Sequence, residues 1–214
     1  MKGGLSRNIP ELVMLPHVLQ PMSSQVLAEY LLDHPDLVRG KDVLDMGSGS
    51  GIQGIAAALA GARSVTLSDL SPHAFANTRE NIDLLECEAT CSLHKGDLFA
   101  PLEGRCFDVI VFAHPYFGDK PVPGLPVTQG MLDDGGLIVR FLKEAPDYLR
   151  NNYRILMPFL DIAGTTNDPR LRGRDAGYKV QELYSKKLAS GLQKGKFHIY
   201  ELTNENGEVE GSQQ

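Results

Sequence analysis

The feature that most constrains the fold is a short apolar segment that runs into a glycine-rich loop and then into a helix. Residues 43–54 read VLDMGSGSGIQG, with three glycines separated by single residues. A strand–loop–helix unit of this kind places backbone N–H groups and a helix N-terminus beside a ligand. It indicates an α/β sheet that binds a nucleotide-like molecule.

Two residues of this segment separate it from loops that bind dinucleotides. The dinucleotide fingerprint needs a third glycine where this chain has Ile52. Asp45 places a carboxylate beside the glycines, which disfavours a phosphate and favours a ligand that carries an ammonium group. A nicotinamide-dependent oxidoreductase is therefore a disfavoured alternative.

Strand-like and helix-like segments alternate along the 214-residue chain. This alternation predicts a Rossmann-like, doubly wound α/β fold with a mostly parallel seven-stranded sheet and helices on both faces. Ser23 or Ser24 is expected to cap the first helix. The expected strands are 41–46, 65–68, 89–94, 107–112, 154–158 and 196–202, with one more near a helix within 176–190, and the other helices are 25–32, 52–59, 72–85 and 137–149.

Length, charge and cysteine content narrow the class of protein. We expect a single domain over 1–214, with an N-terminal lid and helix at 1–40, a core at 41–203 and a polar tail at 204–214. A net charge of −6 disfavours nucleic acid as a partner, and the arginines of 170–174 are interpreted as a solvated turn. No leader, membrane-spanning run or metal-type cysteine spacing is visible, so we expect a cytoplasmic protein with reduced thiols and without a metal site.

Acidic residues end two further strands. Asp69 closes the second expected strand and Asp97 follows the third. Because the carboxyl ends of parallel strands meet at one edge of a sheet, both acids are expected beside the glycine loop. Asp69 can accept ribose hydroxyls or cap the next helix, and Asp97 can accept the amine of adenine or occupy a turn. With Asp45, these acids fit adenosine that bears a cationic amino-acid tail, as in S-adenosylmethionine.

Four motifs in order carry a resemblance to a known family: VLDMGSGSG, the strand-end acid of SVTLSDLS, KGDLF and FDVIVFAHPYF. Over residues 12–202 the chain resembles class I S-adenosylmethionine-dependent methyltransferases, and most of all the NPPY-type enzymes that include release-factor glutamine and ribosomal-RNA guanine methyltransferases. The resemblance implies S-adenosylmethionine as cofactor and S-adenosylhomocysteine as product. Residues 20–24 resemble the segment that closes over the cofactor in relatives. The implied cofactor contacts are Asp45, Gly47, Ser48, Gly49, Gly51, Asp69, Leu70, Asp97, Leu98 and Ala113.

The chain departs from this subgroup after the fourth strand, where relatives carry Asn-Pro-Pro-Tyr and this chain carries Ala113-His114-Pro115-Tyr116. Ala113 has no side-chain acceptor for a planar amide or base nitrogen, which weakens the case for such a substrate. His114 and Tyr116 are the expected catalytic residues. Tyr116 retains an aromatic wall, and His114 either acts as a general base or points to solvent. The proline-rich loop after Tyr116 and the segment from Pro10 to Pro21 are expected to flank the acceptor pocket.

Three functions remain open on the sequence alone. The leading one is methyl transfer to a small molecule or a protein side chain, with a nitrogen, oxygen or carboxyl acceptor. The second keeps the chemistry of the NPPY group, with a backbone carbonyl holding an amide or base nitrogen. The third is a cofactor-binding subunit that lacks catalysis and supports a partner protein.

Overall fold

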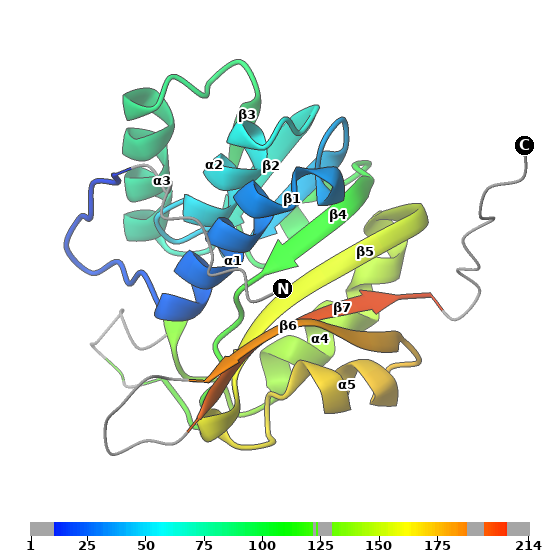
Figure 1. The fold of residues 1–214 in the computed structure, drawn as a ribbon. Helices are drawn as coiled ribbons and strands as arrows, with labels where there is room; N and C mark the ends of the chain where they lie inside the picture. Colours follow the sequence, from blue (N-terminus) through cyan, green and yellow to red (C-terminus); the bar gives the residue numbers. More distant parts are fainter. Residues whose placement is uncertain (1–10, 122, 124–129, 188–194, 205–214) are drawn as a thin grey trace, which may run out of the picture.

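The structure is a computed structural model that describes residues 11–121, 123, 130–187 and 195–204, so Pro10 and the expected tail beyond residue 204 lie outside the described residues. Its seven-stranded sheet has the order β3-β2-β1-β4-β5-β7-β6, which confirms the predicted doubly wound architecture (Figure 1). The strands are β1 (Asp42–Met46), β2 (Ser64–Asp69), β3 (Cys91–Lys95), β4 (Phe107–Phe112), β5 (Leu149–Leu160), β6 (Lys179–Lys187) and β7 (Lys196–Thr203). The α-helices are α1 (Met22–Asp33), α2 (Ile52–Leu59), α3 (Pro72–Leu84), α4 (Gly136–Glu144) and α5 (Pro169–Asp175).

The first five strands are parallel, and β1 lies between β2 and β4. The chain therefore winds outward from β1 in two directions, and the strand order reverses between β1 and β4. Ligands of doubly wound sheets bind outside the carboxyl ends of the strands at such a point. On the other side of β5, β7 is inserted antiparallel between β5 and β6.

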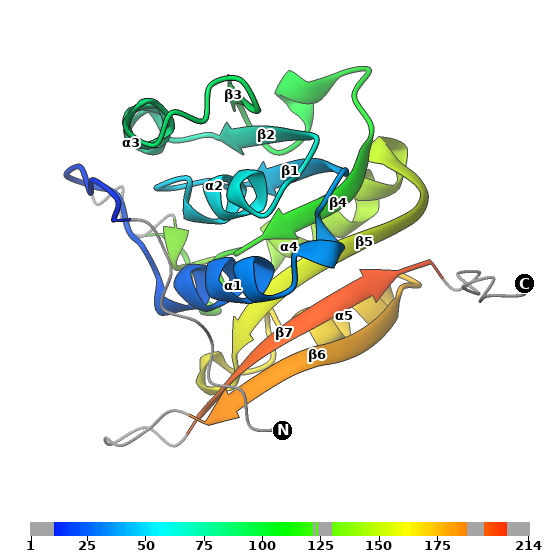
Figure 2. The same ribbon diagram turned by 45° about the horizontal axis from the view of Figure 1, so that its top comes forward.

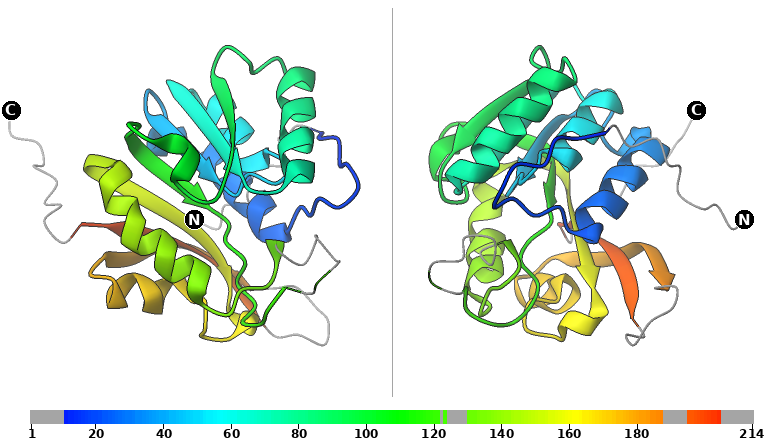
Figure 3. Two further views of the ribbon diagram at one scale, coloured as in Figure 1. Left: turned by 180° about the vertical axis from the view of Figure 1, so that it is seen from behind. Right: turned by 90° about the vertical axis from the view of Figure 1, so that its left-hand side faces the viewer.

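Helices cover both faces of the sheet (Figures 2 and 3). One apolar cluster joins α1, α2 and α3 to strand side chains that include Val43, and a second joins α4 to side chains that include Leu44 and Met46. Because successive strand residues point to opposite faces, Asp45 shares the face of Val43, beneath α2. This alternation decides which residues of β1 can approach a ligand.

Residues 165–190 fold differently from the prediction. The helix expected within 176–190 is wrong, because the residues described there form β6 and the helix, α5, comes before them. The Asp168 side chain accepts a hydrogen bond from the Arg170 N–H, and Pro169 occupies the first helical turn. An aspartate cap followed by proline is a favourable helix start, so the arginines of 170–174 belong to a helix and not to a turn.

Two helix ends also differ from the prediction. The first helix follows Pro21 directly and has no side-chain cap, because Ser23 and Ser24 lie inside its first turn. The helix expected to run to Leu149 ends at Glu144 and continues as a short 3₁₀ turn. Proline at position 146 explains this end, since its nitrogen cannot donate a hydrogen bond within a helix.

Within the part of the chain that the structure describes, no helix is long and apolar enough to cross a membrane. The same residues contain no group of three or more histidine, cysteine, aspartate or glutamate side chains placed to hold a metal ion. Cys87, Cys91 and Cys106 are free thiols.

Candidate functional site

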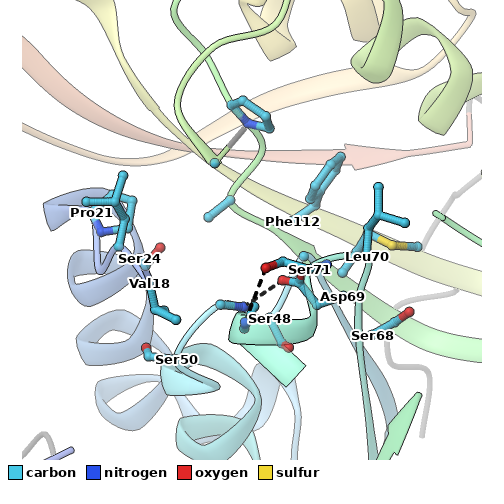
Figure 4. A pocket seen from close by; sticks show the side chains of 18 of the residues that line it. Val18, Pro21, Ser24, Ser48, Ser50, Ser68, Asp69, Leu70, Ser71 and Phe112 are labelled. Carbon is cyan, nitrogen blue, oxygen red and sulfur yellow. Dashed lines mark hydrogen bonds between the residues drawn. The ribbon is translucent and has the colours of Figure 1, made fainter. Parts of the chain in front are cut away.

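A cavity of about 370 Å³ opens at the carboxyl ends of β1, β2 and β4. Figure 4 shows Val18, Pro21 and Ser24 on one side of it and Leu70 and Phe112 on the other. The predicted residues that line it are Gly47, Ser48, Gly49, Asp69, Leu70, Asp97, Leu98 and Ala113. The strand-end positions selected from the sequence are therefore brought together at one crevice.

The glycine loop forms one wall of the cavity through its backbone. Gly47 and Gly49 have φ values of +66° and +58°, a region that glycine adopts at little cost. The N–H groups of Gly47 and Ser48 donate to the carbonyl of Ser68 at 2.8 and 3.1 Å, which fastens the loop to the end of β2. The absence of side chains on the glycines lets a ligand approach the backbone closely.

Polar groups at the end of β2 face the cavity. One carboxylate oxygen of Asp69 accepts the Gly49 N–H at 2.9 Å, and the other accepts the Ser71 N–H at 2.8 Å. Burial raises the pKa of Asp69 above its ordinary value, while these N–H groups act in the opposite direction. Ser68 Oγ is buried, belongs to a residue that lines the cavity, and has no partner among the described residues. A buried hydroxyl in this state fits a ligand that carries its own hydrogen-bonding groups.

The cavity is also lined by Asp97 and Leu98, two and three residues after the end of β3. Leu98 has a φ of +45°, which is uncommon for a residue other than glycine and is often found at functional sites. The carboxylate of Asp97 accepts a hydrogen bond from Arg140 Nη2 at 2.7 Å, and both side chains are about half exposed. Among the residues that the structure describes, the second carboxylate oxygen, Oδ1, has no hydrogen-bond partner, so Arg140 orients the side chain and leaves this oxygen available.

Comparisons with known proteins decide the family. Residues 22–113 match the family model described as ribosomal protein L11 methyltransferase (PrmA). A Methanocaldococcus jannaschii protein provisionally named protein N5-glutamine methyltransferase is 32% identical over 145 residues, which are 65% of this chain and 71% of that protein. The chain belongs to the class I S-adenosylmethionine-dependent methyltransferases. The predicted family, enzyme class and cofactor are therefore confirmed.

Further matches agree with this family. This chain is 34% identical over 179 residues to a release factor glutamine methyltransferase of Moorella thermoacetica. The aligned residues are 78% of this chain but only 59% of that relative. A solved methyltransferase of Pyrococcus furiosus superimposes with a TM-score of 0.64 over 90% of this chain and 88% of that chain, at 21% identity. The latter likeness shows the shared fold.

Two predicted cofactor contacts of the methyltransferase lie behind the cavity. Asp45 is 1% exposed, does not line the cavity, and accepts the Gly54 N–H at 2.8 Å beneath α2. Burial raises its pKa to about 7. A Cβ on Gly51 would lie 3.1 Å from Thr78, so this glycine allows the loop to pack on α3. Neither Asp45 nor Gly51 lines the cavity, and both support the glycine loop from below.

His114 does not point to solvent, so that one of its two expected placements is wrong. Its side chain is buried, at 1% exposed, and does not line the cavity of the methyltransferase. Its Nε2 lies 2.7 Å from the carbonyl oxygen of Asn167, which can only accept, so Nε2 carries the hydrogen. Burial lowers its pKa to about 4, and the ring is neutral at physiological pH. His114 fixes the loop after β4 to the segment before α5.

Tyr116 also packs beneath the cavity instead of forming its wall. Its hydroxyl lies 3.4 Å from Ser23 Oγ, and its ring meets that of Phe159 edge to face at 6.0 Å. Ala113 and Pro115, the alternate residues of the same tetrapeptide, line the cavity instead. Tyr116 therefore joins this loop to the start of α1.

The N-terminal segment of the methyltransferase was expected only to form a lid, without any of its residues being assigned to the site. The structure shows that His17, Val18 and Leu19 line the cavity together with Pro21 and Ser24. The proline spacing and the likeness of residues 20–24 to a cofactor-covering segment were the available signals. Nothing in the local sequence indicated which of these side chains face the ligand.

Proposed function

We propose that this enzyme transfers a methyl group to a nitrogen atom of a protein side chain, with the amide of glutamine as the acceptor. The observation that carries the proposal is that Ala113 and Pro115 line the same cavity as Gly47. This tetrapeptide is the one that resembles the acceptor-binding motif of the NPPY group. The relatives named for glutamine methylation, which the chain spans to 71% and 59%, support the same acceptor.

The cofactor roles follow from the order of groups along the cavity. Asp69 would accept the ribose hydroxyls, and Ser68 Oγ would complete the polar contacts at that end of β2. Leu70 and Leu98 would flank the adenine, and the free oxygen of Asp97 would accept its exocyclic amine. The glycine loop residues Gly47, Ser48 and Gly49 would surround the methionine part. When bound, S-adenosylmethionine supplies a methyl group that is already activated by the sulfonium.

The acceptor would be held by backbone groups of the loop after β4. Ala113 offers no side-chain oxygen, so the carbonyls of this loop are the remaining acceptors for an amide hydrogen. His114 and Tyr116 fix the loop from beneath through Asn167 and Ser23. These contacts align the acceptor nitrogen with the methyl group, which is the main task in this chemistry, and the displaced proton passes to solvent.

The proposed acceptor is tested with labelled S-adenosylmethionine. Purified enzyme is incubated with protein fractions and, separately, with nucleic acids and metabolites from a cell extract, and the labelled product is mapped by mass spectrometry. We expect the methyl group on a glutamine nitrogen of a protein. Label confined to nucleic acid, to metabolites or to another amino acid contradicts the proposal. Tight binding of S-adenosylhomocysteine without any transfer would favour a non-catalytic cofactor-binding subunit.

We also infer a cytoplasmic location and a single methyltransferase domain. Free thiols at Cys87, Cys91 and Cys106 support a reducing compartment. Fluorescence microscopy of the tagged protein in its own cells checks the location, and an extracellular signal would contradict it.

A further inference from the structure

The segment of residues 11–21, here called the strap, crosses the side of the molecule between α3 and α1. It is the dark-blue segment in the right-hand view of Figure 3. Two asparagines of α3, Asn77 and Asn81, hold it, and both are fully buried. Because they are four residues apart on a helix, their side chains lie on one face, one turn from each other.

Within the strap, both asparagines bond to backbone groups only. Asn77 Oδ1 accepts the Leu15 N–H at 2.7 Å, and Asn77 Nδ2 donates to the Val13 carbonyl at 2.8 Å. Asn81 Oδ1 accepts the Val13 N–H at 2.8 Å, and Asn81 Nδ2 donates to the same carbonyl at 3.0 Å. Four hydrogen bonds thus fasten two residues of the strap to α3.

Asn81 also holds the glycine loop. Its Nδ2 donates a second hydrogen bond, to the carbonyl of Ser50 at 2.8 Å. Between the two asparagines, Thr78 Oγ1 donates to the carbonyl of Gly49 at 3.0 Å. One face of α3 is therefore bonded to the strap and to the loop at the same time.

The strap continues from these bonds directly into the cavity wall. His17 turns the chain with a φ of +68°, and its ring lies 4.9 Å from that of His73 at the start of α3. The residues His17, Val18 and Leu19 then line the cavity that the glycine loop bounds. A ligand in this cavity would therefore contact both the strap and the glycine loop.

We propose that Asn77 and Asn81 are positioning residues that retain the cofactor by holding the strap closed. Release of the cofactor then requires the four bonds between the asparagines and the strap to break. The proposal rests on the cofactor site described above and not on the identity of the methyl acceptor. The proposal gives α3 a role in cofactor exchange, because one face of this helix is bonded to both the glycine loop and the strap.

Asn77→Ala tests the proposal most directly, since Asn77 bonds the strap and not the glycine loop. The full chain is loaded with labelled S-adenosylmethionine, and its release is followed after an excess of unlabelled S-adenosylhomocysteine is added. We expect release to be about tenfold faster than in the wild type, which corresponds to about 1.4 kcal/mol. Val38→Ala, a fully buried residue before the amino end of β1, is the control for lost stability and should release at the wild-type rate.

Hydrogen exchange of the wild-type protein provides a second readout that needs no variant. The N–H groups of Val13 and Leu15 are donated to the two asparagines, so their exchange reports opening of the strap. We expect S-adenosylhomocysteine to slow both by the same factor. Wild-type release from Asn77→Ala, or unchanged exchange at both amides on ligand binding, would overturn the proposal. Neither measurement includes an acceptor, so a failed assignment of glutamine leaves the outcome unaffected.

Discussion

Asp45→Asn should change how the stability of the unliganded protein depends on pH. Burial beneath α2 raises the pKa of Asp45 from an ordinary 3.8 to about 7. Between these pH values the folded protein keeps a proton on Asp45 that the unfolded chain releases. The contribution of this protonated carboxyl to the free energy of unfolding is therefore complete below ~pH 4 and is lost as the pH rises through about 7. Asparagine retains an oxygen for the Gly54 N–H and does not ionise.

The size of the effect follows from the shift in the pKa of Asp45. Three pKa units correspond to about 4 kcal/mol of unfolding free energy at alkaline pH, at ~1.36 kcal/mol for each unit. About 3 kcal/mol of this develops between ~pH 5 and ~pH 8. We expect the unfolding free energy of Asp45→Asn, minus that of the wild type, to rise by this amount over the same interval. The cost of packing the amide is constant and cancels from the comparison.

Urea unfolding followed by circular dichroism at several pH values measures this difference. Asp36→Asn, which removes a carboxylate from an exposed residue, is the matched control for the loss of one charge. A difference between Asp45→Asn and wild type that stays constant with pH would refute the reasoning. A difference that falls with pH would show that the folded protein favours the charged carboxylate.

Three further predictions concern the site. Asp69→Ala should weaken S-adenosylhomocysteine binding about 10- to 100-fold, because a charged acceptor for the ribose is lost, and calorimetry that finds unchanged affinity would place the ribose elsewhere. Ala113→Asn should raise kcat/KM for a glutamine acceptor by about tenfold or more, because it adds a preorganised oxygen; equal values would show that the backbone already suffices. His114→Gln should leave the shape of the pH–rate profile above ~pH 6 unchanged, since the pKa of His114 is about 4. A profile limb near neutral pH that disappears in this variant would identify His114 as a base.

The parts of the site that could be predicted from the sequence depend on topology. Asp69 ends β2 and Asp97 follows β3 by two residues, and parallel strands bring their carboxyl ends to one edge regardless of packing detail. The glycine loop likewise carries its own conformation, because Gly47 and Gly49 need a positive φ. These features are local or follow from strand order, so one sequence is enough to find them.

The parts that could not be predicted depend on packing between distant segments. His114 is neutral and buried because the carbonyl of Asn167, 53 residues later, receives its hydrogen. The strand β1 is buried on both faces, so its hydrophobic pattern does not show that Asp45 points beneath α2. The helix expected within 176–190 failed for a different reason: helix-forming lysine, glutamate and leucine residues there belong to a strand whose pairing with β7 overrides their preference.

The attachment of the strap through its main chain has a consequence for how this sequence can vary. The hydrogen bonds from α3 reach the backbone of Val13 and Leu15, and the intervening Met14 is 42% exposed. Substitutions at such outward positions leave every one of those backbone hydrogen bonds in place. The side chains of the strap can therefore vary while its backbone keeps the same course. Position 14 is for the same reason suited to carry a spectroscopic label. The signal of this label would report opening and closing of the strap as the cofactor binds and is released.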